Sequence, residues 1–149
     1  MLDYVNGDLM KAPELVIMHG CNAQRTMGKG VAKLIRAQFP YAYEQYLQGS
    51  QTLGDVIFAI PPTDDGKIIA NAITQDKFRK TYDDDNVQYV DYDAIEQSFK
   101  TVNQFCKENG IDTIAVPKIG AGLAGGDWAI IEQLIVKSTP DITVKVYCI

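Results

Sequence analysis

Blocks of apolar residues recur along the chain with two different spacings, and these spacings predict strands that alternate with helices. Short apolar runs rich in β-branched residues are typical of buried strands, and apolar residues at every third or fourth position are typical of amphipathic helices. The expected strands cover residues 2–5, 15–19, 56–60, 67–74, 113–116 and 143–148. The expected helices cover residues 31–39, 41–48 and the stretch from Asp91 to Asn109, and a fourth follows Asp127. This order predicts an α/β fold, a three-layer sandwich with helices on both faces of the sheet.

Three of the predicted helices have one apolar face that we expect to pack on the sheet. Asp91 and Asp127 can each cap a helix amino terminus, and Gly49 and Gly110 can end the helices before them. The residues expected on buried faces are Val31, Leu34, Ile35 and Phe39 in the first helix, Ile95, Phe99, Val102 and Cys106 in the third, and Ile130, Ile131, Leu134 and Ile135 in the fourth.

Two glycine-rich loops each follow an apolar strand and precede a helix. The first contains Gly28-Lys29-Gly30, and the second runs from Gly120 to Gly126. Backbone N–H groups in such loops can converge on an anion because no Cβ blocks the approach, and the helix dipole adds to the attraction. If the two strands are neighbours, the loops face each other across one crevice at the carboxyl ends of the strands. Two such loops suit a diphosphate, although tight helix–sheet packing also explains glycine there.

Other nucleotide motifs fit the chain less well. Gly120, Gly122 and Gly125 formally match G-x-G-x-x-G, but a lone match is weak and a dinucleotide fold needs further βαβ units after it. The first loop lacks the Lys-Ser/Thr pair of a triphosphate-binding loop. We therefore expect neither a nicotinamide domain nor a triphosphatase.

Four polar side chains are candidates for specific roles, and each has a structural alternative. His19 ends a strand just before the first loop, so it could act as a general base or be a core histidine bonded to the backbone. Asn22 could bind a ribose hydroxyl or stabilise a turn. Asp8 could accept from an exocyclic amine or stabilise its own turn. Tyr147 could stack on a base or pack in the core.

Composition and charge narrow the class of protein. The chain has 149 residues with 46% apolar and 22% charged residues, which predicts a single domain, residues 1–149. The net charge of −5 argues against an extended nucleic-acid surface. Cys21, Cys106 and Cys148 form no C-x-x-C, which favours free thiols in an intracellular, cytoplasmic protein. We expect no membrane partner because no apolar run has spanning length, and no metal site because there is one histidine.

The ordered motifs together resemble the macro domain, an ADP-ribose-binding family. The resemblance rests on residues 4–9, 19–22, 27–32, 117–123 and 144–147 and runs nearly from end to end. It implies a mixed central sheet and binding of ADP-ribose without a cofactor. It also implies that Asp8 reads the adenine amine and that Asn22 lies near the terminal ribose. The implied ligand-binding residues are Gly7, Asp8, Leu9, Gly20, Cys21, Asn22, Met27, Gly28, Lys29, Gly30, Val31, Ala32, Ile119, Gly120, Ala121, Gly122, Leu123, Ala124, Gly125 and Tyr147.

Two branches of that family share local runs with this chain. The run from His19 to Asn22 is similar to yeast-type ADP-ribose 1''-phosphate phosphatases, which implies catalytic roles for these two residues and hydrolysis of ADP-ribose 1''-phosphate. The run from Gly122 to Trp128 resembles the branch with terminal ADP-ribose protein glycohydrolase and the DNA ADP-ribose-removing antitoxins. That branch relies on a lysine directly after the strand threonine, where this chain has Gln75.

Three alternatives therefore stay open. The first is an ADP-ribose 1''-phosphate phosphatase. The second is a reader module that binds ADP-ribosylated targets without turnover. The third is a hydrolase that removes ADP-ribose from protein or nucleic acid with Lys77 moved into place, although Ala124 stands where the glycohydrolase has an aspartate.

Overall fold

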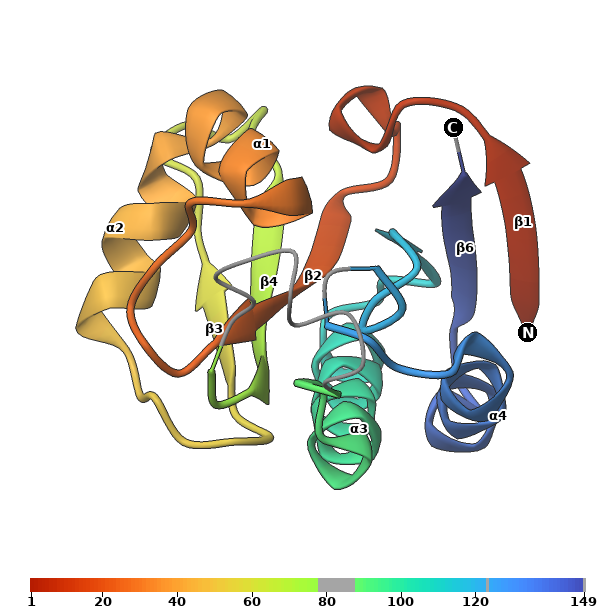
Figure 1. The fold of residues 1–149 in the computed structure, drawn as a ribbon. Coiled ribbons are helices and arrows are strands. Elements are labelled where there is room, and N and C mark those ends of the chain that lie inside the picture. Colours follow the sequence, from red (N-terminus) through yellow and green to blue (C-terminus); the bar gives the residue numbers. More distant parts are fainter. Residues whose placement is uncertain (78–87, 123, 149) are drawn as a thin grey trace.

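A mixed six-stranded sheet with the order β1-β6-β5-β2-β4-β3 crosses the molecule (Figure 1). The structure is a computed structural model, and it describes residues 1–77, 88–122 and 124–148. Neighbouring strands are parallel except β3 and β4, which are antiparallel. The strands are β1 (Leu2–Asn6), β2 (Val16–Asn22), β3 (Val56–Ala59), β4 (Ile68–Gln75), β5 (Thr113–Val116) and β6 (Thr143–Cys148).

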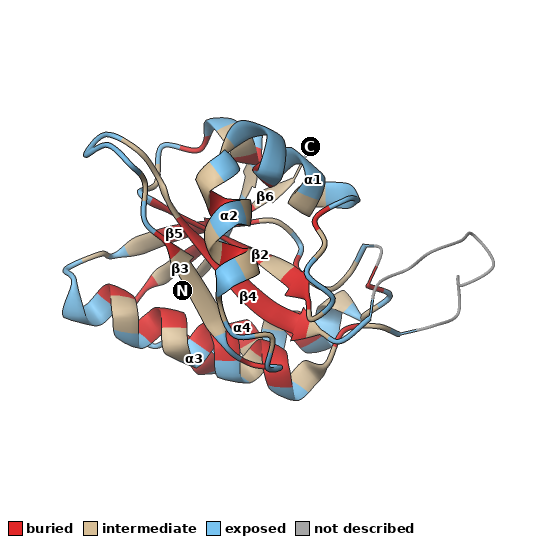
Figure 2. Ribbon diagram, turned by 90° about the vertical axis from the view of Figure 1, so that its left-hand side faces the viewer, coloured by how far each residue is buried: buried red, intermediate tan, exposed pale blue. Residues whose placement is uncertain are grey.

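Helices cover both faces of this sheet. Figure 2 shows α1 and α2 above the buried strands and α3 below them. Separate apolar clusters form on the two faces: one joins the sheet to α3 and α4, and the others join it to α1 and α2. The predicted three-layer α/β sandwich is therefore confirmed. The helices are η1 (Leu9–Lys11), α1 (Gly30–Gln38), α2 (Pro40–Gln48), α3 (Tyr92–Glu108) and α4 (Trp128–Ser138).

The predicted caps define where two helices begin. The Asp91 side chain accepts from the backbone N–H of Ala94 at 2.9 Å, at the start of α3. Asp127 accepts in the same way from Ala129 at 3.0 Å, at the start of α4. Because these carboxylates satisfy N–H groups that the helix leaves unpaired, they fix the amino termini where the sequence predicted them.

Two residues predicted on buried helix faces are exposed instead. Leu34 of α1 is 51% exposed and Ile130 of α4 is 42% exposed, whereas Ile35, Ile131 and Ile135 are fully buried. Each helix rests on the sheet along a strip narrower than its apolar stripe. The spacing therefore identified the correct side of each helix, but the edge of that side remains in solvent.

The side chains of β2 alternate between the two faces of the sheet. Val16 and Met18 belong to the cluster under α3 and α4, and Ile17 belongs to the cluster under α1 and α2. Successive strand residues point to opposite faces. His19 and Cys21 therefore lie on the α1–α2 side, and this determines what His19 can reach.

The sheet opens between β2 and β5 toward their carboxyl ends. These strands are in register only at Val16 with Ile114 and at Ile17 with Ala115. By contrast, β2 stays paired with β4 as far as Asn22 opposite Gln75. The space beyond Ile17 is therefore bounded by β2 and β4 on one side and by the end of β5 on the other.

Candidate ligand-binding cavity

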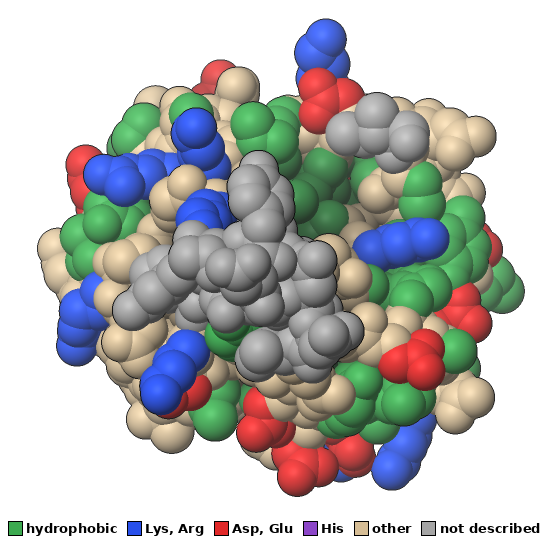
Figure 3. Space-filling view, in the orientation of Figure 1, with side chains coloured by type: hydrophobic (Ala, Val, Ile, Leu, Met, Phe, Trp, Pro, Cys, Tyr) green, Lys and Arg blue, Asp and Glu red, His purple; other side chains and the backbone are tan. Residues whose placement is uncertain are grey.

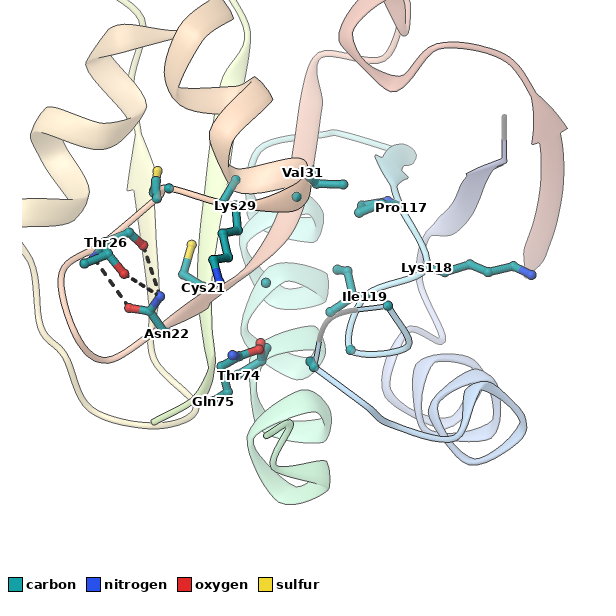
Figure 4. Close-up of a pocket in the computed structure, with 18 residues that line it drawn as sticks. Cys21, Asn22, Thr26, Lys29, Val31, Thr74, Gln75, Pro117, Lys118 and Ile119 are labelled. Atoms are coloured by element: carbon teal, nitrogen blue, oxygen red, sulfur yellow. Dashed lines mark hydrogen bonds between the residues drawn. The ribbon is translucent and has the colours of Figure 1, made fainter. Parts of the chain in front are cut away.

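A cavity of about 500 Å³ lies where the sheet opens (Figure 4), within the size range of small-molecule sites. Its walls come from the carboxyl ends of β2 and β4, from the loop between β2 and α1, and from the loop after β5. The described lining residues are Gly20, Cys21, Asn22, Thr26, Met27, Gly28, Lys29, Gly30, Val31, Ala32, Thr74, Gln75, Pro117, Lys118, Ile119, Gly120, Gly122 and Ala124.

The two glycine loops meet at this cavity, as the sequence predicted. Their strands β2 and β5 are paired neighbours in the sheet, so both loops leave the same edge. Gly28 and Gly122, one from each loop, line the cavity. The predicted crevice between the loops is confirmed.

The glycines of these loops fall into two physical classes. A Cβ at Gly28 or Gly122 would meet no atom of the described residues within 4 Å, so packing among those residues does not require glycine at either position. By contrast, Gly120 has a φ of +80°, and a Cβ there would lie 2.8 Å from the side chain of Val90. Gly120 therefore shapes its loop, whereas Gly28 and Gly122 leave open space where a ligand can approach the backbone.

The first loop is held by side chains. Asn22 Nδ2 donates to the Thr26 carbonyl at 3.1 Å and to Thr26 Oγ1 at 2.9 Å, and the backbone N–H of Gln24 donates to Asn22 Oδ1 at 2.9 Å. These bonds turn the Asn22 amide into the loop, as Figure 4 shows. Asn22 therefore stabilises a turn and also lines the cavity, and its predicted contact with a ribose hydroxyl stays a prediction.

The second loop is held by its main chain. The N–H of Gly126 donates to the Gly120 carbonyl at 2.7 Å, and that of Gly125 donates to the Gly122 carbonyl at 3.1 Å. The Ala124 carbonyl accepts from Tyr89 at 2.7 Å and from Val90 at 3.1 Å. These bonds close the loop on itself and tie it to the segment that precedes α3.

The amino termini of the two helices differ in how their N–H groups are used. At α4 the Asp127 side chain caps the terminus. At α1 no side chain makes a capping hydrogen bond among the described residues, and Val31 and Ala32 in the first turn line the cavity. An uncapped helix terminus that faces a cavity favours an anion there.

His19 is not among the described residues that line the cavity, and its predicted part in catalysis stays a prediction. Its side chain is fully buried, and its Nε2 lies 2.6 Å from Asn71 Oδ1 on β4. Asn71 Nδ2 donates to the Ala42 carbonyl at 3.2 Å, so Oδ1 is the free acceptor and His19 donates to it. Burial lowers the pKa of His19 to about 4, so the ring is neutral at pH 7.

Cys21 lines the cavity beside that histidine. Its Sγ lies 3.6 Å from His19 Nε2 and 3.9 Å from His19 Nδ1. Burial raises the pKa of the Cys21 thiol far above its usual range, so the sulfur stays protonated. The thiol therefore contributes a nonpolar wall rather than a nucleophile.

Several predicted ligand-binding residues lie away from the described cavity wall: Gly7, Asp8, Leu9, Ala121, Gly125 and Tyr147. Asp8 accepts from the backbone N–H of Met10 at 2.9 Å and so caps η1. The Tyr147 hydroxyl donates to Glu14. Leu123 lies outside the described residues, as do residues 78–87 of the predicted surface loop.

Five lining residues were missing from the predicted set: Thr26, Thr74, Gln75, Pro117 and Lys118. Thr26, Pro117 and Lys118 adjoin predicted residues in the chain, so the loop boundaries could have included them. Thr74 and Gln75 arrive through the pairing of β4 with β2, and no local pattern signals that. Lys77, the alternative catalytic lysine, is exposed and does not line the cavity.

Charge at the described cavity wall is positive and sparse. In Figure 4 Lys29 points into the cavity and Lys118 points away from it. Lys118 Nζ lies 5.9 Å from the centre of the Trp128 ring. On the face shown in Figure 3, the coloured basic side chains are interspersed with acidic and apolar ones.

Within the described residues, no group of three or more His, Cys, Asp or Glu side chains is arranged to hold a metal. The described lining also includes neither a carboxylate nor an imidazole. None of the helices in the described ranges combines the length and apolar character needed to cross a membrane.

Comparisons with known proteins agree with this geometry. A family model described as the Macro domain matches residues 18–135. The DNA ADP-ribosyl glycohydrolase of Mycobacterium tuberculosis is 28% identical over 155 residues, which cover 99% of this chain and 42% of that protein. The ADP-ribose 1''-phosphate phosphatase of Scheffersomyces stipitis is 29% identical over 178 residues, with 100% of both proteins covered. The macrodomain of Thermus aquaticus DarG superposes with a TM-score of 0.82 at 26% identity, with 100% of this chain and 99% of that chain covered.

The chain spans less than half the length of the mycobacterial relative but the whole length of the yeast relative.

Proposed function

The chain belongs to the macro domain family, and from this premise we propose that it binds ADP-ribose and hydrolyses a group at its terminal ribose, as an ADP-ribose 1''-phosphate phosphatase. The observation that carries the proposal is the single cavity between two glycine loops that leave adjacent strands. Gly28 and Gly122 each leave open space in that cavity, so both loops can present backbone N–H groups to one diphosphate.

The first loop supplies the stronger anion site. The uncapped amino terminus of α1 faces the cavity, and Lys29 adds a positive charge that points into it. Since helix N–H groups and a lysine both stabilise phosphate oxygens, we place one phosphate of the ligand here. The second phosphate then lies toward Gly122.

The proposed chemistry depends on positioning. Hydrolysis adds water across the bond between phosphorus and the ribose oxygen and releases inorganic phosphate and ADP-ribose. The loops hold the unreactive diphosphate through backbone N–H groups, and holding the ligand at both loops orients the bond to the 1''-phosphate at the terminal ribose. His19 has no part in this proposal because its side chain is buried on the α1–α2 face of the sheet, against Asn71.

A second candidate is a reader that binds ADP-ribose without turnover. It is favoured by the described cavity wall, which includes neither a carboxylate nor an imidazole that could move a proton. The named hydrolase relatives support turnover, and their substrates differ: ADP-ribosylated DNA for the mycobacterial protein and ADP-ribose 1''-phosphate for the yeast protein.

Two measurements test the proposal. Calorimetric titration with ADP-ribose, with AMP as the control for a ligand that lacks the diphosphate, should give saturable binding of ADP-ribose only. Incubation with ADP-ribose 1''-phosphate, ADP-ribosylated DNA and ADP-ribosylated protein, followed by chromatography, should release phosphate from the first. Release of ADP-ribose from either macromolecule instead would replace the phosphatase by a glycohydrolase. Binding without any product would support the reader module instead of the hydrolase. No binding of ADP-ribose would overturn the whole proposal.

A further inference from the structure

Tyr46 of α2 is buried behind the first loop and contacts Asn22, the residue from which the loop leaves β2. The side chain is fully buried, and its hydroxyl lies 2.6 Å from the Asn22 carbonyl oxygen and 3.0 Å from Asn22 Oδ1. Burial raises the pKa of the phenol well above its usual range, so the hydroxyl remains a donor. Tyr46 does not line the cavity, and its ring packs in one cluster with Cys21 and Met27, which do.

Asn22 connects Tyr46 to the loop through hydrogen bonds of its own side chain. Its oxygen accepts from Tyr46 and from the N–H of Gln24, and its two amide hydrogens are used by the Thr26 carbonyl and hydroxyl. The orientation of the amide is fixed because one side meets donors and the other meets acceptors. A continuous chain of hydrogen bonds therefore runs from α2 through Asn22 to Thr26 at the cavity wall.

We infer that Tyr46 is a positioning residue that keeps the first loop in its ligand-binding shape, acting through Asn22 and never touching the ligand. This inference rests on the proposed function, in that the ligand is taken to be ADP-ribose.

The physical reason is the cost of a missing donor. Without the Tyr46 hydroxyl, the Asn22 carbonyl and Oδ1 lose a donor in a buried place, so conformations of the loop that expose them to water become more populated. The apparent dissociation constant rises by the inverse of the fraction of molecules that keep the competent loop. Loss of one buried hydroxyl donor shifts this equilibrium about tenfold, which is the largest weakening of affinity that it can cause.

The same helix offers a matched control. Tyr41 also lies on α2, and its hydroxyl also donates to a backbone carbonyl, that of Lys67 just before β4. Tyr41 belongs to a different packing cluster from Tyr46, and neither Tyr41 nor Lys67 lines the cavity. Tyr46→Phe and Tyr41→Phe therefore each remove one phenolic hydroxyl from α2, but only the first removes a contact to the loop.

The experiment compares these two variants with the wild-type protein. We expect Tyr46→Phe to bind ADP-ribose more weakly by calorimetry, by up to about tenfold, and Tyr41→Phe to bind it as wild type does. Without ligand, amide hydrogen exchange in residues 23–29 should be faster in Tyr46→Phe and unchanged in Tyr41→Phe. Saturating ADP-ribose should restore protection in Tyr46→Phe, because the ligand selects the competent loop.

Equal affinities in the two variants would overturn the inference, and so would unchanged exchange of residues 23–29 in Tyr46→Phe. A double-mutant cycle with Thr26→Val should show coupling between the two sites, since both act on Asn22, and strictly additive effects would also count against it. The exchange measurement needs no ligand. If the wild-type protein fails to bind ADP-ribose, the proposed function fails, while the exchange result still decides whether Tyr46 holds the loop.

Discussion

The two loops that form the cavity reach similar positions by different means. The first is held by side chains: Asn22 bonds to Thr26, and Tyr46 bonds to Asn22. The second is held by its main chain, with a positive φ at Gly120 and a bond from the Gly126 N–H to the Gly120 carbonyl. The first loop also has a positive φ at Arg25 and Gly30, so both loops depend on backbone geometry, and the difference lies in the Asn22 and Tyr46 side chains that hold the first.

The strands that lead into the two loops differ in their titratable residues. The largest effect that we predict is therefore a loss of stability in acid. Strand β5 carries no titratable residue, but β2 carries His19, whose pKa is lowered to about 4 by burial. The unfolded chain binds this proton below its ordinary pKa of about 6.5 and the native state does not. The contribution of neutral His19 to the free energy of unfolding is therefore fully present above about pH 6.5. It is lost as the pH falls toward 4, by about 3 kcal/mol in all.

Urea unfolding at pH 7 and at pH 4.5 measures this loss. The control is His19→Gln, which keeps a donor for Asn71 and cannot titrate, and it should show a flatter pH dependence than wild type. Identical slopes in the two proteins would mean that another group is responsible for the acid sensitivity.

The next largest effect should come from the backbone of the second loop. Gly120→Ala places a Cβ 2.8 Å from the Val90 side chain at a φ of +80°. Left-handed backbone alone costs about 1–2 kcal/mol for a residue with a side chain, so we expect a loss of about 2 kcal/mol or more in the free energy of unfolding. The first loop supplies the contrast: the added methyl group of Gly28→Ala meets no atom within 4 Å in the described part of the chain, so this variant should leave stability unchanged in the same denaturant titration.

A smaller effect, on affinity alone, should come from the two open glycines. Gly28→Ala and Gly122→Ala each put a methyl group at the cavity wall, into space that no described residue fills. We expect both variants to melt like wild type and to bind ADP-ribose about tenfold more weakly, a difference of about 1.4 kcal/mol. Calorimetry decides the matter, and a loss in one variant only would show that the ligand approaches one loop and not both.

Local patterns were sufficient to predict the six strands and four α-helices in the described residues of this fold, but not the short helix η1. The strand and helix segments, the caps at Asp91 and Asp127, and the meeting of the two loops all follow from spacing and from the rule that parallel strands place their carboxyl ends together. Exposed Leu34 and Ile130 mark the limit of that reasoning, because the width of a helix contact depends on the sheet beneath it.

Pairings between distant parts of the chain decided the rest of the site. His19 was expected at the ligand because it stands just before a loop, but its partner Asn71 is 52 residues away and seals it in the core. Thr74 and Gln75 reach the cavity through the register of β4 on β2. The role of Tyr46 depends on a contact 24 residues back in the chain. No periodicity in the sequence signals such contacts.

The short register between β2 and β5 has a mechanical consequence. Only two residue pairs join these strands. The sheet therefore consists of one half with β2, β4 and β3 and another with β5, β6 and β1, and the two halves meet along a short strand pairing. A ligand bound by both loops lies across the open end of this pairing and connects the two halves. We therefore expect a bound ligand to make the sheet more rigid, and hydrogen exchange of the backbone amides in β2 and β5 would measure this effect.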